Sequence, residues 1–225
     1  MVSSNLKESD LHLEVLSAAT RKAFLGFSQV PWLKKEGWYL AGGTALALQA
    51  GHRSSVDLDF FTENKSFDEA TLENNLLRLE DWHTDSNDNG TMYGVFRKAK
   101  TSFIAYPFFK PSSTIKMFGT IRILSADDIA VMKIIALSQR GRKRDFVDLY
   151  WYCNNGGDLE EIFSRMVEQY PQKHNFNHIL KSLSYFDDAE KDPMPMVNFK
   201  VTWQEIKSYF RSEVSALTRR LLKLK

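Results

Sequence analysis

The sequence predicts an α/β (α+β) fold in which a mixed β-sheet with surrounding helices is followed by a helical C-terminal region. Two observations lead to this prediction. Before residue 125, short segments with the two-residue alternation of β-strands are interspersed with segments of helical periodicity. From Ser125 onward, only helical periodicity remains. We therefore expect a core at residues 1–124 and a helical region at residues 125–225, either as two domains or as one compact unit.

Composition and charge limit the classes of protein to consider. The chain has 225 residues, of which 43% are hydrophobic, and this is enough for a packed interior. The net charge of +2 is too small to indicate nucleic-acid binding by itself. The apolar runs are far shorter than the roughly 18–20 residues of a membrane span, and the N-terminus has no apolar signal segment. The single cysteine, Cys153, excludes an intrachain disulfide. We expect a cytoplasmic protein with no membrane partner.

Helices and short strands alternate in the first part of the chain. Apolar residues at helical spacing predict a helix over residues 9–27, and Pro31 breaks the segment that follows. Ser66 and Glu69 have capping-box spacing, which predicts that a helix begins there. Three segments between these helices are WYLA at 38–41, a short strand; GTALALQAG at 43–51, a short helix; and SSVDLDFF at 54–61, a strand.

Strands and then helices are expected further along. SNDNG at 86–90 is a turn signal. After it, three segments have strand character: TMYGVFRK at 91–98, TSFIAYPFF at 101–109 and GTIRIL at 119–124. Helices are predicted for ADDIAVMKIIALSQR at 126–140, RKRDFVDLYWYC at 142–153 and LEEIFSRMVEQY at 159–170. A last helix follows a capping box formed by Thr202 and Glu205.

Two carboxylates lie one residue apart in the strand at 54–61. Side chains alternate between the faces of a strand, so Asp57 and Asp59 point the same way, roughly 6.5–7 Å apart. Val56, Leu58 and Phe60 then point into the core. Like charges on one face repel each other, and a divalent cation such as Mg²⁺ or Mn²⁺ would neutralise them. The alternative is an ordinary solvated strand face.

Two glycines open the helix that precedes these acids. A helix N-terminus offers unpaired backbone N–H groups to an anion, and Gly42 and Gly43 have no side chain that would keep a phosphate away. Thr44 adds a hydroxyl donor and Arg53 a cation. If the strands at 38–41 and 54–61 are neighbours, the phosphates of a nucleoside triphosphate would lie against a metal at the acidic pair. The alternative is a tight turn without a ligand.

Two motifs together resemble a known family. GGTALAL…GHRSSVDLDFF and the later MKIIALSQRGRKRDFVDLY are similar to the AbiEii/AbiGii-type nucleotidyltransferase toxins, which belong to the polymerase-β-like nucleotidyltransferase superfamily. The similarity covers residues 38–61 and 121–151. It implies a polymerase-β-like nucleotidyltransferase core that uses an NTP and a divalent metal. The implied site residues are Gly42 and Gly43 on the phosphates, Asp57 and Asp59 on the metal, Lys133 on phosphate, and Asp145 with Asp148 completing the site.

The resemblance also implies partners. Toxins of this type are paired with a separate antitoxin protein, and relatives transfer nucleotides to tRNA acceptor ends, whereas some relatives are linked to phosphoryl transfer. In one respect this chain departs from the superfamily pattern. A third carboxylate is usual on a neighbouring strand, but at the expected position in KTSFIAYPF this sequence has Ser102. Asp145 is our candidate for a replacement acid.

The second motif has its own alternatives. Lys133 lies close to the apolar face of its predicted helix, so it either extends to water or reaches a buried anion. Asp145 and Asp148 share a helix side, and they could instead pair with Arg142 and Arg144 at the surface.

We predict a nucleotidyltransferase that moves a nucleoside monophosphate from an NTP to a hydroxyl acceptor, such as tRNA or another RNA, and that binds the nucleotide in a cleft between core and helical region. The alternatives are an NTP-binding module without transfer activity, a kinase-like enzyme acting on a protein, and a metal nuclease.

Overall fold

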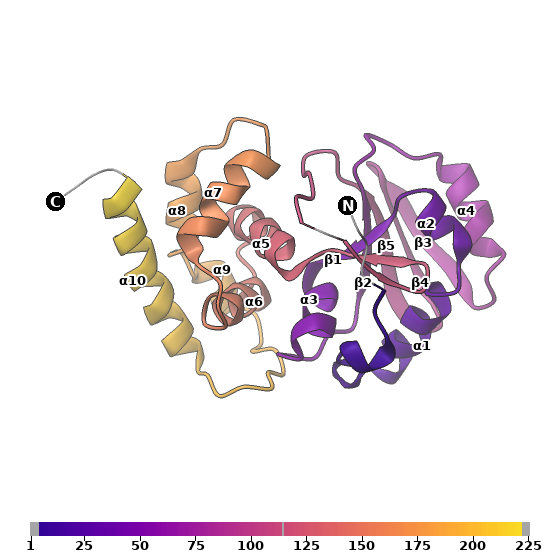
Figure 1. Ribbon diagram of the computed structural model, residues 1–225, viewed down its shortest axis with the longest axis horizontal. Helices are drawn as coiled ribbons and strands as arrows, with labels where there is room; N and C mark the ends of the chain where they lie inside the picture. The colour runs from indigo at the N-terminus through magenta and orange to yellow at the C-terminus, as the bar shows by residue number, and fades with distance from the viewer. Residues whose placement is uncertain (1–4, 114, 222–225) are drawn as a thin grey trace. The chain divides into compact units, whose positions relative to one another are not determined.

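A computed structural model describes residues 5–113 and 115–221 (Figure 1). These residues divide between Ser125 and Ala126 into two compact units. The elements of the first unit are the 3₁₀ turns Glu8–Asp10 and Leu13–Val15, α1 Ala18–Phe27, α2 Pro31–Lys35, β1 Tyr39–Ala41, α3 Gly42–Ala50, β2 Leu58–Thr62, α4 Glu69–Leu77, β3 Trp82–Asp88, β4 Thr91–Phe96, β5 Ala99–Ala105, β6 Lys116–Phe118 and β7 Ile121–Ile123.

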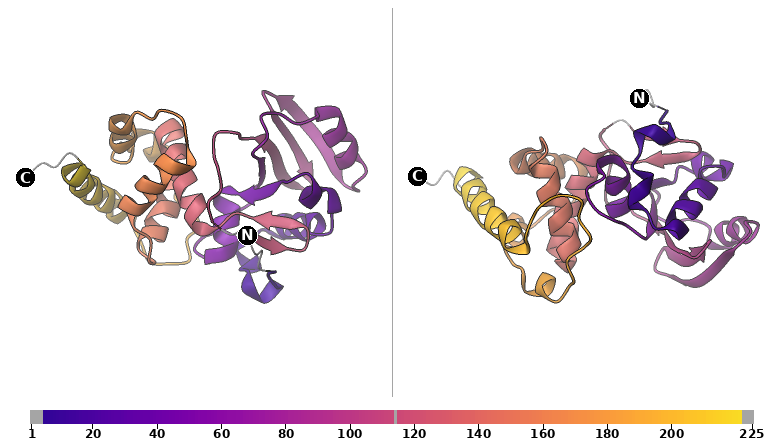
Figure 2. Two further views of the ribbon diagram at one scale, coloured as in Figure 1. Left: turned by 45° about the horizontal axis from the view of Figure 1, so that its top comes forward. Right: turned by 90° about the horizontal axis from the view of Figure 1, so that it is seen from below.

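The described strands of the first unit form one mixed sheet in the order β3-β4-β5-β2-β1-β7-β6. The left view of Figure 2 shows β3, β4 and β5 side by side in purple. β1 and β2 are antiparallel, with Ala41 opposite Asp59. β2 and β5 are parallel, with Asp59 opposite Ser102. The predicted α/β fold with a mixed sheet is therefore confirmed, and β2 lies between the strand that leads into the glycines and the strand that carries Ser102.

Aromatic side chains build the core on one face of this sheet. Phe60 and Phe103 stack with ring centroids 5.1 Å apart. Phe27 of α1 packs edge-on against Phe60, also at 5.1 Å. These three rings are at most 1% exposed. Because alternate residues of β2 point to opposite faces, the burial of Leu58 and Phe60 directs Asp59 to the other face.

Several sequence predictions for the first unit are wrong in detail. The alternation was expected to bury Val56, but this side chain is 56% exposed because β2 begins only at Leu58. In the segment 9–27, which was predicted to be one helix, the α-helix begins only at Ala18. Ser17 caps it by accepting a hydrogen bond from the backbone N–H of Thr20 at 3.1 Å.

Helix starts and two strands also differ from expectation. α4 is capped by Asp68, whose Oδ1 accepts from the backbone N–H of Thr71 at 3.1 Å, rather than by Ser66. Pro31 begins α2 instead of breaking the chain, since proline is well suited to the first helical position. β3 and β6 were not predicted, and β3 includes part of the segment that reads as a turn.

The second unit is helical in its described part, with α5 Ala126–Arg140, α6 Lys143–Cys153, α7 Leu159–Gln169, α8 Phe176–Ser182, α9 Asp187–Glu190 and α10 Trp203–Leu221 (Figure 1). The capping box of α10 is confirmed, because Thr202 and Glu205 exchange backbone-to-side-chain hydrogen bonds of 2.7 and 3.2 Å. Phe146 packs against Phe186 and Phe210 and so joins α6 to its neighbours. Among the described residues, no helix combines the length and apolarity that a membrane crossing requires.

Candidate active site

The glycine turn and the Asp59 carboxylate are next to each other. α3 begins at Gly42, whose φ of +71° lies in the left-handed region that favours glycine. A Cβ atom at Gly42 would lie 3.4 Å from Oδ2 of Asp59. The antiparallel register of β1 and β2 produces this proximity, since it places Ala41 opposite Asp59. The condition stated for the strands at 38–41 and 54–61, that they are neighbours, is thus met by β1 and β2.

The two carboxylate oxygens of Asp59 face different neighbours. Oδ2 is the oxygen near the glycine turn. Oδ1 accepts a hydrogen bond of 2.5 Å from the hydroxyl of Ser102 on β5. Ser102 is only 5% exposed, whereas Asp59 is partly accessible. The neighbouring strands therefore hold the carboxylate in a fixed orientation toward the N-terminus of α3.

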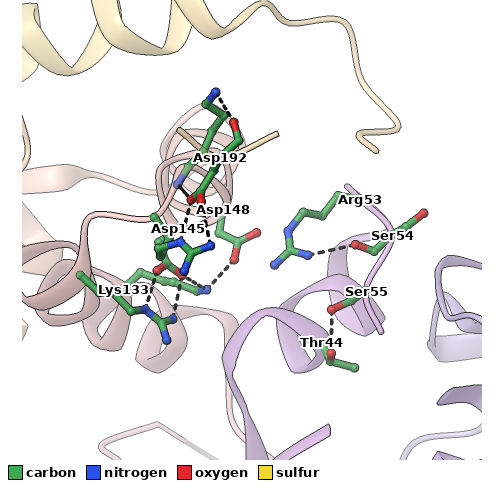
Figure 3. Close-up of polar contacts among 11 residues, drawn as sticks. Thr44, Arg53, Ser54, Ser55, Lys133, Asp145, Asp148 and Asp192 are labelled. Atoms are coloured by element: carbon green, nitrogen blue, oxygen red, sulfur yellow. Dashed lines mark hydrogen bonds and ion pairs between the residues drawn. The ribbon is translucent and has the colours of Figure 1, made fainter. Parts of the chain in front are cut away.

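Thr44 joins the first turn of α3 to the segment before β2. Its hydroxyl donates to the backbone carbonyl of Asp57. The hydroxyl of Ser55 lies 2.7 Å from that of Thr44 (Figure 3). A hydroxyl has one proton, and that of Thr44 is used in the bond to the backbone carbonyl. The predicted donation from Thr44 to phosphate can therefore come only from its backbone N–H. Asp57 is consequently anchored just before the strand.

Arg53 is buried in the loop between α3 and β2. Arg53 is only 4% exposed, and its Nη1 donates to the carbonyl oxygen of Ser54 at 2.9 Å (Figure 3). The loop therefore holds a fixed positive charge in the connection between the glycine helix and the acidic strand.

The acidic pair is compatible with a magnesium ion whose remaining ligands come from the substrate. No group of three or more His, Cys, Asp or Glu side chains suited to a metal occurs within the part of the chain that the structure describes. Mg²⁺ commonly binds through one or two carboxylates, with phosphate oxygens and water completing its octahedron. Asp57 and Asp59 offer hard oxygen ligands of this kind, and both are partly accessible.

In the second unit, Lys133 reaches buried anions, as one of the two sequence alternatives expected. Its ammonium lies 2.6 Å from Oδ1 of Asp145 and 2.6 Å from Oδ2 of Asp148 (Figure 3). Both carboxylates are fully buried, so neither lies at the surface as the other alternative required. Lys133 on α5 and the two acids on α6 thus form a buried charge cluster that joins these helices.

Arg140 extends this cluster. Its Nε donates to Oδ2 of Asp145 at 3.0 Å. Burial alone would raise the pKa of Asp145, but the charges of Lys133 and Arg140 outweigh it and hold this pKa below its ordinary value. Asp145 is therefore ionised. Arg142 instead pairs with Asp192 at 2.7 Å, a contact across fifty residues that sequence spacing does not reveal.

Comparisons with known proteins identify the family of this chain. A family model described as "Nucleotidyl transferase AbiEii toxin, Type IV TA system" matches residues 32–117 and 102–220. A protein of Aquifex aeolicus is 36% identical over 183 residues, which are 79% of this chain and 86% of that protein.

Solved structures are similar to this chain over most of its length. The nucleotidyltransferase toxin MenT4 of Mycobacterium tuberculosis superposes with a TM-score of 0.56 at 15% identity, covering 90% of this chain and 86% of MenT4. A putative nucleotidyltransferase of Helicobacter pylori gives a TM-score of 0.54 at 17% identity, with coverages of 93% and 99%. At these identities the similarity establishes the fold, which is that of nucleotidyltransferases.

Proposed function

The chain belongs to the AbiEii family of nucleotidyl transferase toxins, and on this premise we propose that it transfers a nucleoside monophosphate from an NTP to an RNA hydroxyl in a Mg²⁺-dependent reaction. The first acceptor to test is tRNA. One observation supports this proposal above the others: an accessible carboxylate, Asp59, lies against a glycine-entered helix N-terminus. A helix N-terminus binds phosphate and a carboxylate binds the cation that accompanies it.

Each residue of the first unit has a role in this proposal. Gly42 and Gly43 present backbone N–H groups to the β- and γ-phosphates, and the charge of Arg53 lies in the adjoining loop. Asp57 and Asp59 hold the cation. When bound, Mg²⁺ neutralises charge on the phosphates and aligns them for in-line displacement. The acceptor oxygen forms a bond to the α-phosphorus while the bond to the bridging oxygen breaks, and pyrophosphate leaves.

The buried cluster of the second unit is assigned a supporting role. We propose that Asp145 and Asp148 position Lys133, and that Lys133 in turn contacts a phosphate of the nucleotide. The ammonium group has three donors, of which two face these carboxylates at 2.6 Å, so one remains for an anion. The partner of the toxin would be a cognate antitoxin protein, in keeping with the type IV toxin–antitoxin description of the family.

The experiment compares NTPs labelled at the α- or the γ-phosphate, incubated with total tRNA, Mg²⁺ and the protein. Nucleotidyl transfer places only the α label on RNA. Asp57→Asn and Asp59→Asn should each abolish this labelling, whereas Asp188→Asn, which changes an exposed acid of the second unit, should leave it unchanged. Circular dichroism checks that each variant is folded.

Other outcomes identify the competing functions. Incorporation of γ label into protein would indicate a kinase-like enzyme. A thermal shift with NTP and Mg²⁺ but no transfer of either label would indicate a nucleotide-binding module. Labelling that persists in both carboxylate variants would refute the assignment of the metal ligands.

A further inference from the structure

A row of directly opposed residues crosses the sheet at the candidate site. The register places Ala41 of β1 opposite Asp59 of β2, Asp59 opposite Ser102 of β5, and Ser102 opposite Tyr93 of β4. Opposed residues in a sheet share a face. The hydrogen bond between Ser102 and Asp59 agrees with this assignment. Tyr93 therefore lies on the same face as the candidate metal ligand, two strand spacings or about 10 Å away.

Tyr93 and its surroundings are suited to a nucleic-acid ligand. The Tyr93 side chain is 47% exposed although the residue lies within β4. Lys100 lies two residues before Ser102 on β5, so its side chain is on this face as well, and it is also exposed. An exposed aromatic ring can stack on a base, and a neighbouring lysine can bind the phosphate of the same strand.

The chemistry of the proposed reaction determines on which side the acceptor must enter. In phosphoryl transfer the attacking and leaving oxygens are roughly in line. The glycine turn, which would hold the leaving pyrophosphate, adjoins β2 through β1. The opposite side of β2 is occupied by β5 and then β4. An acceptor hydroxyl in line with the leaving group therefore approaches across Ser102, from the direction of Tyr93.

We propose that β4 and β5 form the acceptor subsite, in which the base of the terminal nucleotide of a single-stranded RNA stacks on Tyr93 and a backbone phosphate binds Lys100. This inference rests on the proposed function for its direction of attack. RNA ends without base pairs suit such a subsite because their bases are free to stack on an aromatic ring. The subsite is built entirely from residues of the first unit.

Direct binding of RNA tests the subsite without nucleotide or metal. A fluorescein-labelled single-stranded RNA is titrated with the protein, and affinity is read from anisotropy. Tyr93→Ala should weaken binding about tenfold or more. Tyr93→Phe, which keeps the ring, should retain near wild-type affinity. The matched control is Tyr185→Ala, since Tyr185 is 52% exposed but belongs to the second unit, and this variant should bind as wild type does.

Salt dependence and kinetics complete the test. Lys100→Ala should reduce the slope of log affinity against log salt concentration by about one, as expected for one lost phosphate contact. In the transfer assay, Tyr93→Ala should raise the KM for RNA and leave the KM for NTP unchanged.

The inference and the proposed function fail in different ways. Unchanged RNA affinity in Tyr93→Ala, or an equal loss in Tyr185→Ala, would overturn the acceptor subsite even if the enzyme transfers nucleotides. RNA binding that depends on Tyr93 in a protein that transfers no label would support the subsite and refute only the proposed reaction.

Discussion

We predict that Gly42→Ala lowers both the stability of the protein and its affinity for NTP, by amounts that follow from the structure. Replacing Gly42 by alanine puts a methyl group 3.4 Å from Oδ2 of Asp59, an ordinary contact that the folded protein tolerates. The φ of +71° costs a non-glycine residue about 1–2 kcal/mol. The methyl group also fills the space through which a phosphate would reach the first N–H groups of α3. Losing one charge-assisted hydrogen bond there costs about 1.5–3 kcal/mol, which is roughly 10- to 150-fold in NTP affinity.

Gly156 provides the matched control for this substitution. Its φ is +99°, and a Cβ atom there would meet no heavy atom within 4 Å. Gly156→Ala should therefore lose a similar amount of stability without any change at the site. Unfolding in urea measures the first effect, and NTP titration with Mg²⁺ measures the second. Equal NTP affinity in Gly42→Ala and Gly156→Ala would refute the phosphate cradle.

Three further predictions concern the second unit. Asp145→Asn should cost about 3–5 kcal/mol of unfolding free energy, because Lys133 loses a buried counter-ion. Since the folded-state pKa of Asp145 is lowered, the difference in unfolding free energy from wild type should be complete above the ordinary pKa of 3.8. This difference should shrink as the pH falls below 3.8, as acid titration of stability will show. Thr202→Ala removes the cap of α10 and should cost about 1 kcal/mol in urea unfolding, with Glu205→Gln costing less. Burial raises the pKa of Cys153 to about 11, so its alkylation by iodoacetamide should be slow at pH 8 relative to the unfolded chain and should accelerate toward pH 11.

The central part of the fold could be predicted because local and tertiary signals agree there. The residues of α3 and β2 have the periodicity of their elements, and Gly42 marks the turn between β1 and α3. β3 could not be predicted in the same way. Its sequence WHTDSND is mostly polar and includes turn-forming residues, and pairing with β4 holds it in the sheet. A strand that depends on its neighbour for stability leaves little trace in its own sequence.

The candidate site shows the same division. The spacing of Asp57 and Asp59 predicts a shared strand face, but β2 begins only at Leu58, so strand alternation does not place Asp57. The resemblance predicts Ser102 in place of a third acid, and the register places Ser102 opposite Asp59. Spacing also puts Asp145 and Asp148 on one side of their helix. It does not reveal their partner, because Lys133 lies on a different helix and the 2.6 Å contacts arise only when α5 and α6 pack. Contacts between elements are the information that local periodicity lacks.

Ser102 changes the electrostatics next to Asp59. A carboxylate at this position would lie about one strand spacing, roughly 4.8 Å, from Asp59, and the two like charges would require more positive charge between them. The Ser102 hydroxyl instead donates to Oδ1 at 2.5 Å and adds no charge. The proposed metal site then has two carboxylates, Asp57 and Asp59, the number that one Mg²⁺ with phosphate ligands commonly uses. A neutral hydroxyl is also a poor proton acceptor, so in the proposed reaction Ser102 would not take the proton of the attacking hydroxyl.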